Sequence, residues 1–324
     1  MKLLVTGAAG FVGSHLSERL VSDGHEVVGL DNFETGSKEN LKGLAGNTRF
    51  SFVELSVTDI SPSPSPPKGG REWMQGIQGI FHLASPASPK DFSEIPVQIA
   101  VTNSVGTLRV LELAEKLKAR VLMASTSECY GEPLKHPQNE EDLGQVSTTG
   151  PRSCYDEGKR FAEALCMAFV RSRNLDIRIV RIFNTYGPRL RLEDGRVLSN
   201  FFKQALSKEA LTLYGEGQQT RSFCYVEDLV DGLVRAYMTE GMTGEVVNLG
   251  NDREISVAEL ASKVSALCGV PHNVKKLPLP HADDPSRRRP DLAKAKARLG
   301  YSPKISLEEG LKRCLPWYRG VLGK

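Results

Sequence analysis

Short apolar runs alternate with amphipathic stretches through the first half of the chain. The runs have the continuous hydrophobic character of strands that are buried on both faces of a sheet. They cover residues 2–6, 26–31, 50–54, 80–84, 120–125 and 176–183. Between them, apolar residues recur every three or four positions and predict helices over 14–21, 97–118 and 153–173. Strands that alternate with helices predict an α/β fold with a Rossmann-type, doubly wound parallel sheet.

The pattern changes after residue 183, where residues 184–196 are rich in Gly, Pro and Asn and mark a boundary. We expect residues 1–182 and 224–245 to form a dinucleotide-binding domain. Residues 183–223 and 246–324 then form a smaller, largely C-terminal region that binds the substrate. Alternating Ser and Pro over 61–67 predict an exposed loop, and a partner-binding proline motif is the less favoured interpretation.

A glycine-rich turn directly follows the first predicted strand. Gly7, Gly10 and Gly13 permit a tight turn and a close approach of the backbone to a pyrophosphate, and the following helix offers its N-terminal N–H groups to the anion. Asp31 ends the second strand about 20 residues further on, where its carboxylate can bind a ribose and repel a 2′-phosphate. The combination predicts NAD rather than NADP. A turn without a ligand is the weaker interpretation.

Tyr155 and Lys159 are four positions apart in a predicted helix, so they project from one face. An ammonium group beside a phenol lowers the phenol pKa and creates a general base. The pair follows a strand that ends in Ser125-Thr126-Ser127-Glu128, at the carboxyl edge of the sheet where open α/β folds bind ligands. The coincidence favours a catalytic site over a surface pair.

Composition excludes several other classes of function. The net charge of +3 is the difference between 42 basic and 39 acidic residues, which is too small to favour a nucleic-acid polymer as partner. The six cysteines form no CxxC pair, so we expect neither a disulfide framework nor a metal site, and reduced thiols favour a cytoplasmic location. No apolar run approaches the roughly 20 residues of a membrane span.

The glycine spacing, the Ser/Thr-rich fifth strand and the Tyr155–Lys159 pair resemble the extended short-chain dehydrogenase/reductases, which act on nucleotide sugars. Within that group, longer strings resemble the UDP-glucuronate decarboxylase (UDP-xylose synthase) family. The triplet Thr126-Ser127-Glu128 distinguishes this family from its relatives, because related 4,6-dehydratases carry Thr-Asp-Glu there and epimerases usually lack the glutamate. The strings are LASPASP (83–89), ASTSECYGEP (124–133), RSCYDEGKR (152–160), RIFNTYGPR (181–189), DGRVLSNF (194–201), QTRSFCYV (219–226) and DDPSRRRPD (283–291).

This resemblance implies an NAD-dependent decarboxylase that converts UDP-glucuronate to UDP-xylose through a UDP-4-keto intermediate, with some 4-keto-pentose released. Tyr155 would take the proton of the sugar 4-hydroxyl, and Thr126 would hydrogen-bond the same oxygen. Glu128 would position the sugar ring. Arg288 would pair with the sugar carboxylate or protonate C5. The catalytic set is Thr126, Glu128, Tyr155, Lys159 and Arg288.

The resemblance also implies the binding residues. NAD would be held by Gly7, Gly10, Phe11, Val12, Gly13, Asp31, Asn32, Thr35, Gly36, Leu83, Asn103, Tyr155, Lys159, Thr185 and Arg196. The UDP-sugar would be held by Ser127, Tyr155, Asn184, Asn200, Arg221 and Arg288, whereas Arg287 and Arg289 are expected to be solvated. Related enzymes dimerise through helices that correspond to 97–118 and 153–173, so we expect a homodimer.

Two positions depart from the decarboxylase pattern. Ser56 replaces an Asp that commonly meets adenine, and Val101 replaces a Lys that commonly helps to hold the substrate carboxylate. The second change puts carboxylate affinity in question and favours release of the keto intermediate. Two alternatives stay open, namely a 4-epimerase acting on a UDP-hexuronate and a non-catalytic NAD-binding scaffold.

Overall fold

A seven-stranded parallel sheet forms the centre of the protein, in the strand order β11-β6-β5-β4-β1-β2-β3. The computed structural model describes residues 1–61, 72–278 and 287–323. Nearly all of the predicted Ser/Pro-rich loop lies outside these residues. The strands are β1 (Lys2–Thr6), β2 (Glu26–Asp31), β3 (Phe50–Glu54), β4 (Ile77–His82), β5 (Arg120–Thr126), β6 (Ile177–Ile182) and β11 (Val246–Leu249).

Helices cover both faces of this sheet, as the continuous apolar strands require. Leu3 and Val5 of β1 face one way and pack in a core with α1 (Phe11–Ser22) and α7 (Val226–Met238). Leu4 between them faces the other way, into a core with α4 (Thr107–Leu117) and α5 (Ser153–Arg173). This two-sided burial confirms the predicted doubly wound α/β class.

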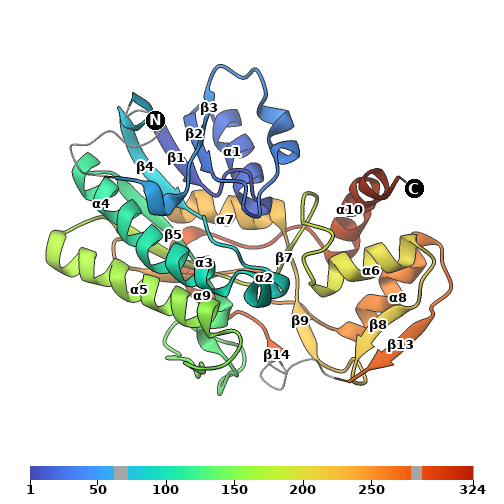
Figure 1. The fold of residues 1–324 in the computed structure, drawn as a ribbon. Helices are drawn as coiled ribbons and strands as arrows, with labels where there is room; N and C mark the ends of the chain where they lie inside the picture. The colour runs from blue at the N-terminus through green and yellow to red at the C-terminus, as the bar shows by residue number, and fades with distance from the viewer. Residues whose placement is uncertain (62–71, 279–286, 324) are drawn as a thin grey trace.

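The smaller region lies at the right of Figure 1, beyond the carboxyl ends of the strands. Its apolar residues continue the core of the α1 and α7 face without a break, because Phe202 and Leu260 belong to the same cluster as Leu3. Its elements are α6 (Val197–Leu206), β8 (Leu211–Tyr214), β9 (Thr220–Ser222), β12 (Glu254–Ser256), α8 (Val257–Cys268), β13 (Val274–Leu277), β14 (Arg287–Arg288) and α10 (Leu307–Leu322). Short connecting elements are α2 (Pro89–Glu94), α3 (Pro96–Val101), β7 (Thr185–Tyr186), β10 (Cys224–Tyr225) and α9 (Ala293–Leu299).

Four elements of the sheet and its covering helices differ from the prediction by more than one residue. The first helix begins at Phe11 rather than at residue 14. The fourth strand begins at Ile77 rather than at residue 80. The helix predicted over 97–118 is divided, because a π-helical turn at Thr102–Gly106 separates α3 from α4. The strand β11 was not predicted and pairs with β6 at the edge of the sheet. We therefore propose that the dinucleotide-binding domain continues through Leu249.

Candidate functional site

A cavity of about 1120 Å³ opens at the carboxyl ends of the strands, between the sheet and the smaller region. Its walls contain all but one of the residues predicted for the site. They are Gly7, Gly10, Phe11, Val12, Gly13, Asp31, Asn32, Thr35, Gly36, Leu83, Thr126, Ser127, Glu128, Tyr155, Lys159, Asn184, Thr185, Arg196, Asn200, Arg221 and Arg288. Both departures from the family pattern, Ser56 and Val101, line it too. The cavity therefore joins the predicted dinucleotide site to the predicted catalytic site.

The exception is Asn103, which the structure places beneath the cavity wall. It lies in the π-helical turn, is 1% exposed, and donates from Nδ2 to the Ile99 carbonyl at 3.1 Å. Its Oδ1 atom has no hydrogen-bond partner among the described residues. A contact between Asn103 and a cofactor stays a prediction.

The glycine turn has the shape that a dinucleotide requires. Gly7 has φ +73°, and a Cβ atom there would lie 2.9 Å from the Ala84 nitrogen. A Cβ atom at Gly13 would lie 2.0 Å from the Gly7 carbonyl oxygen. Gly10 precedes the first turn of α1 and contributes no side-chain cap, so the helix N-terminus faces the cavity without a competing side chain. These residues fit a pyrophosphate.

Asp31 is held at the end of β2 by backbone donors. Its Oδ2 accepts from the Ala9 N–H at 3.0 Å, and its Oδ1 accepts from the Phe33 N–H at 2.8 Å. Burial raises the pKa of this carboxyl group, and the backbone N–H groups oppose that shift. The carboxylate is thus oriented at the cavity edge, where it can accept from a ribose hydroxyl.

Tyr155 and Lys159 project into the cavity from α5, as predicted. The Lys159 ammonium lies 6.0 Å from the centre of the Tyr155 ring and donates to the Ala124 carbonyl at 2.9 Å. Burial lowers the pKa of Lys159 to about 8. The prediction that Lys159 lowers the phenol pKa of Tyr155 is wrong for this structure. Burial raises the pKa of Tyr155 well above its usual value, and Thr126 only partly opposes this by hydrogen bonding.

Glu128 is bound by two guanidinium groups. It lies in the 3₁₀ turn Ser127–Tyr130, directly after β5. Arg288 forms a two-fold ion pair with its carboxylate, in which Nη2 lies 2.8 Å from Oε2. Arg152, the residue before α5, also donates to Oε2. Burial disfavours the charge on Glu128, but both arginines outweigh it and hold its pKa below the usual value.

A second carboxyl group, that of Asp156, lies beside the cluster formed by Glu128, Arg152 and Arg288. Asp156 Oδ2 lies 3.5 Å from Arg152 Nε, and its Oδ1 has no hydrogen-bond partner among the described residues. Burial and the charge of Glu128 raise the pKa of Asp156 to about 7. Arg152 and Arg288 thus face the single low-pKa carboxylate of Glu128, while the raised pKa of Asp156 weakens the negative charge of the second carboxyl group near neutral pH. This arrangement favours an anionic ligand.

Arg221 and Arg288 lie side by side on paired strands, β9 and β14. Both are almost completely buried, and Arg221 donates to the Thr220 carbonyl at 2.9 Å. Arg287 is exposed, as predicted, whereas Arg289 is only partly exposed and lies 3.5 Å from Glu254. Neither residue lines the cavity. Asn184 and Asn200 line the wall between β6 and α6. Forked donors in such a wall suit phosphate oxygens.

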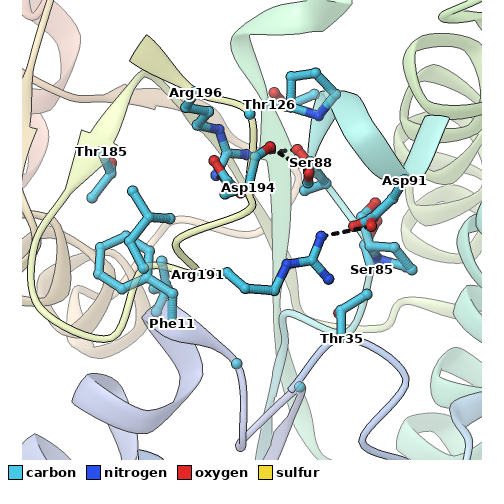
Figure 2. Close-up of a pocket in the computed structure, with 18 of the residues that line it drawn as sticks. Phe11, Thr35, Ser85, Ser88, Asp91, Thr126, Thr185, Arg191, Asp194 and Arg196 are labelled. Carbon is cyan, nitrogen blue, oxygen red and sulfur yellow. Dashed lines mark hydrogen bonds and ion pairs between the residues drawn. The ribbon is translucent and has the colours of Figure 1, made fainter. Parts of the chain in front are cut away.

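The segment 187–196 crosses the cavity and is bonded to segment 85–91, which sequence reasoning did not predict. Figure 2 shows Arg191 reaching toward Asp91, at 2.6 Å between Nη2 and Oδ1. Arg196 donates to the Ala87 carbonyl at 2.6 Å, and Ser88 Oγ donates to the Asp194 carbonyl at 2.5 Å. No local motif marks these pairs, because their members are about 100 positions apart in the chain.

Other polar groups near the site have structural partners. His82 bonds Thr6 at 2.8 Å and Thr107 at 3.2 Å, and burial lowers its pKa to about 3, which confirms it as a core residue. Among residues 1–61, 72–278 and 287–323, no cluster of three or more His, Cys, Asp or Glu side chains could hold a metal ion. No helix in the described part of the chain has both the length and the apolar character to span a membrane.

Comparisons with known proteins extend over nearly the whole chain. The profile of the NAD dependent epimerase/dehydratase family matches residues 3–250. UDP-glucuronic acid decarboxylase 1 of Xenopus tropicalis is 46% identical over 321 residues, which cover 99% of this chain and 73% of that protein. UDP-glucuronic acid decarboxylase 3 of Arabidopsis thaliana is 47% identical over 312 residues, covering 96% and 87%.

A solved structure supports the same fold. UDP-glucuronic acid 4-epimerase of Bacillus cereus, in complex with UDP-glucuronic acid and NAD, has a TM-score of 0.87 and 31% identity to this chain. The alignment covers 99% of this chain and 100% of that chain. In sequence, this chain is closer to the two decarboxylases than to that epimerase.

Proposed function

The chain belongs to the NAD dependent epimerase/dehydratase family, and we propose that it decarboxylates UDP-glucuronate to UDP-xylose with NAD as its cofactor. One observation carries the choice of an acidic sugar. Two arginines, the largely buried Arg152 and the buried Arg288, converge on the single carboxylate of Glu128 beside Tyr155. A pocket with surplus positive charge in this position suits a sugar that bears its own carboxylate.

Different residues of the chain carry out different steps of the reaction. NAD, when bound, supplies reversible hydride acceptance at sugar C4. Tyr155 takes the proton of the 4-hydroxyl and later returns it, while Thr126 hydrogen-bonds the same oxygen. Lys159 holds a positive charge below pH about 8 at 6.0 Å from the centre of the Tyr155 ring, and this charge acts against the burial that raises the phenol pKa. The resulting 4-ketone makes the C5 carboxylate β to a carbonyl.

Loss of carbon dioxide then needs no further redox partner. The C5–C6 bond breaks, its electron pair passes into the C4 carbonyl as an enolate, and C5 afterwards takes a proton. Arg288 pairs with the carboxylate before it leaves, and Glu128 orients the ring. Arginine is a weak acid at its usual pKa, so charge pairing is its main role.

The remaining wall residues bind the two nucleotide ends. The turn from Gly7 to Gly13 binds the NAD pyrophosphate with backbone N–H donors, and Asp31 accepts from the adenosine ribose. Arg221, with Asn184 and Asn200, donates to the UDP diphosphate. The smaller region thus binds the nucleotide sugar, and the sheet binds the cofactor.

An assay with three simultaneous readouts tests the proposal. Purified protein is incubated with UDP-glucuronate and NAD while carbon dioxide, NADH absorbance and product mass are followed. Carbon dioxide with a UDP-pentose and no lasting NADH supports the proposal. An unchanged sugar mass without carbon dioxide supports the 4-epimerase. Bound NAD without turnover supports the scaffold.

We further propose that the protein is a homodimer through α3, the π-helical turn and α5. Val97, Val105 and Phe161 are exposed to 70%, 39% and 51% on these packed elements, which leaves an apolar face open. Light scattering of the full chain should give twice the monomer mass, and Phe161→Glu should lower it to the monomer mass. A monomeric wild type would overturn this proposal without affecting the proposed reaction.

A further inference from the structure

The carboxylate of Glu128 is shared between two arginines that come from distant parts of the chain. Arg288, on β14, donates to both oxygens, and Arg152, directly before α5, donates to Oε2. All three side chains line the cavity, and all three are at least 85% buried. The cluster therefore sits where it meets the sugar, largely out of contact with water.

This arrangement creates a conflict for Arg288. The proposed function requires its guanidinium to pair with the substrate carboxylate, but the fork already holds Glu128 through both of its terminal nitrogens. If Arg288 turns toward the substrate, Glu128 loses its two-fold partner inside a buried site. An uncompensated buried carboxylate is strongly unfavourable. Arg288 could not make the exchange unless another cation remained on Glu128.

Arg152 is placed to be that cation. Its Nη2 donates to Glu128, while its Nε lies 3.5 Å from Asp156, one helical turn along α5. The guanidinium is thus held from two sides, and its contact with Glu128 does not depend on Arg288. Because its position is set by the helix that also carries Tyr155, the contact can persist while β14 residues rearrange.

We propose that Arg152 is a positioning residue that keeps Glu128 charged and in place, so that Arg288 can exchange Glu128 for the carboxylate of the substrate. The inference rests on the proposed function and deepens it, because it makes recognition of an acidic sugar depend on a residue that acts through Glu128 and does not itself pair with the sugar carboxylate. Arg152 would then control affinity for the carboxylate specifically, and not affinity for the nucleotide.

Calorimetric titration of the NAD-loaded protein separates these contributions, with Tyr155→Phe present in every protein that is compared so that UDP-glucuronate is bound but not consumed. UDP-glucuronate, UDP-glucose and UDP share the nucleotide, but only the first carries the sugar acid. Arg152→Met should weaken binding of UDP-glucuronate about 30-fold while UDP and UDP-glucose change less than about threefold. Arg152→Lys should recover part of the loss. If Arg152 acted only in folding, Arg152→Met would weaken the binding of all three ligands to a similar extent.

A second substitution tests the exchange itself. Glu128→Gln in the Arg152→Met background removes the charge that traps Arg288, so it should restore UDP-glucuronate affinity to within about fivefold of wild type. Arg160→Met is the matched control, because Arg160 lies on the same helix but donates to the Cys129 and Leu143 carbonyls. It should leave the ratio of UDP-glucuronate to UDP affinity unchanged.

Equal losses for all three ligands, no loss in Arg152→Met, or no recovery in the double variant would each overturn the inference. Failure of the proposed function has a different signature. In that case the wild-type protein would release no carbon dioxide or would bind UDP-glucuronate no better than UDP-glucose.

Discussion

The two ends of the cavity are built in opposite ways. At the NAD end, a contiguous turn of the backbone from Gly7 to Gly13 shapes the site, and Asp31 is held by main-chain N–H groups. At the sugar end, charged side chains from β5, the start of α5 and β14 converge through ion pairs. The NAD end depends on glycines, which lack side chains and so let backbone segments approach closely. The sugar end depends on opposite charges that neutralise one another only after distant segments have come together.

The largest effect is expected at the sugar end. Tyr155→Phe keeps the ring stacked on Phe92, at 5.1 Å between centroids, but removes the hydroxyl that moves the proton. Turnover of UDP-glucuronate should fall about 10³-fold, with the dissociation constants of both ligands nearly unchanged. Stopped-flow NADH absorbance and calorimetry measure the two quantities. Turnover within about tenfold of wild type would remove Tyr155 as the base.

At the NAD end, a single added methyl group should lower both the stability of the protein and its affinity for NAD. Gly13→Ala places a Cβ atom 2.0 Å from the Gly7 carbonyl oxygen, inside backbone that cannot move away cheaply. We expect a loss of about 3 kcal/mol in the free energy of unfolding and a large loss of NAD affinity. Urea denaturation with and without NAD measures both.

Gly320→Ala is the control for that change, because Gly320 lies in α10 with open space around its Cα. Alanine there should stabilise the protein by about 0.5–1 kcal/mol and leave NAD affinity unchanged. If Gly13→Ala behaves like Gly320→Ala, the backbone shape of the turn does not determine the NAD end.

The charge balance at the sugar end should be visible as a pH dependence. Burial and Glu128 raise the pKa of Asp156 from 3.8 to about 7, so the folded state binds more protons than the unfolded state between these values. The associated stabilisation is complete below pH 3.8 and is lost as the pH rises through 7. Asp156→Asn should reduce the loss of stability between pH 5 and 8 by about 2 kcal/mol. Parallel wild-type and variant denaturation profiles would contradict the shift.

The smallest effect concerns Val101, a cavity residue where the resembling decarboxylases commonly carry Lys. Val101→Lys should lower the KM for UDP-glucuronate about fivefold and reduce the share of turnovers that leave NADH behind. Val101→Met, which adds length without charge, should change neither. Product ratios by mass spectrometry decide between a charge effect and a steric effect.

The NAD end could be predicted from the sequence because its determinants are local. Three strands, β1, β2 and β3, lie at the predicted residues, and the turn follows the first of them directly. The strand β11 was missed because its four residues, VVNL, are too few to show a period. The π-helical turn was missed for a related reason, since its residues continue the helical pattern on both sides.

The sequence predicted most residues of the sugar end, but it did not predict their ion pairs and pKa shifts. Arg152 stands in the RSCYDEGKR string beside the predicted tyrosine, yet nothing in that string shows that it meets Glu128. The pKa of Tyr155 was expected to fall from the Lys159 charge alone, whereas burial raises it. Both outcomes depend on packing between segments more than 20 positions apart, which spacing along one helix does not contain.

The proposed function requires both ends of the cavity to act on the same sugar in one redox-neutral cycle. The decisive measurement uses UDP-glucuronate labelled with deuterium at C4, with the product pentose analysed by NMR after one enzyme turnover. Most of the deuterium is expected again at C4 of a UDP-pentose, with carbon dioxide released. Deuterium found mainly in free reduced cofactor, or in a hexuronate that has kept its carboxylate, would overturn the redox-neutral cycle.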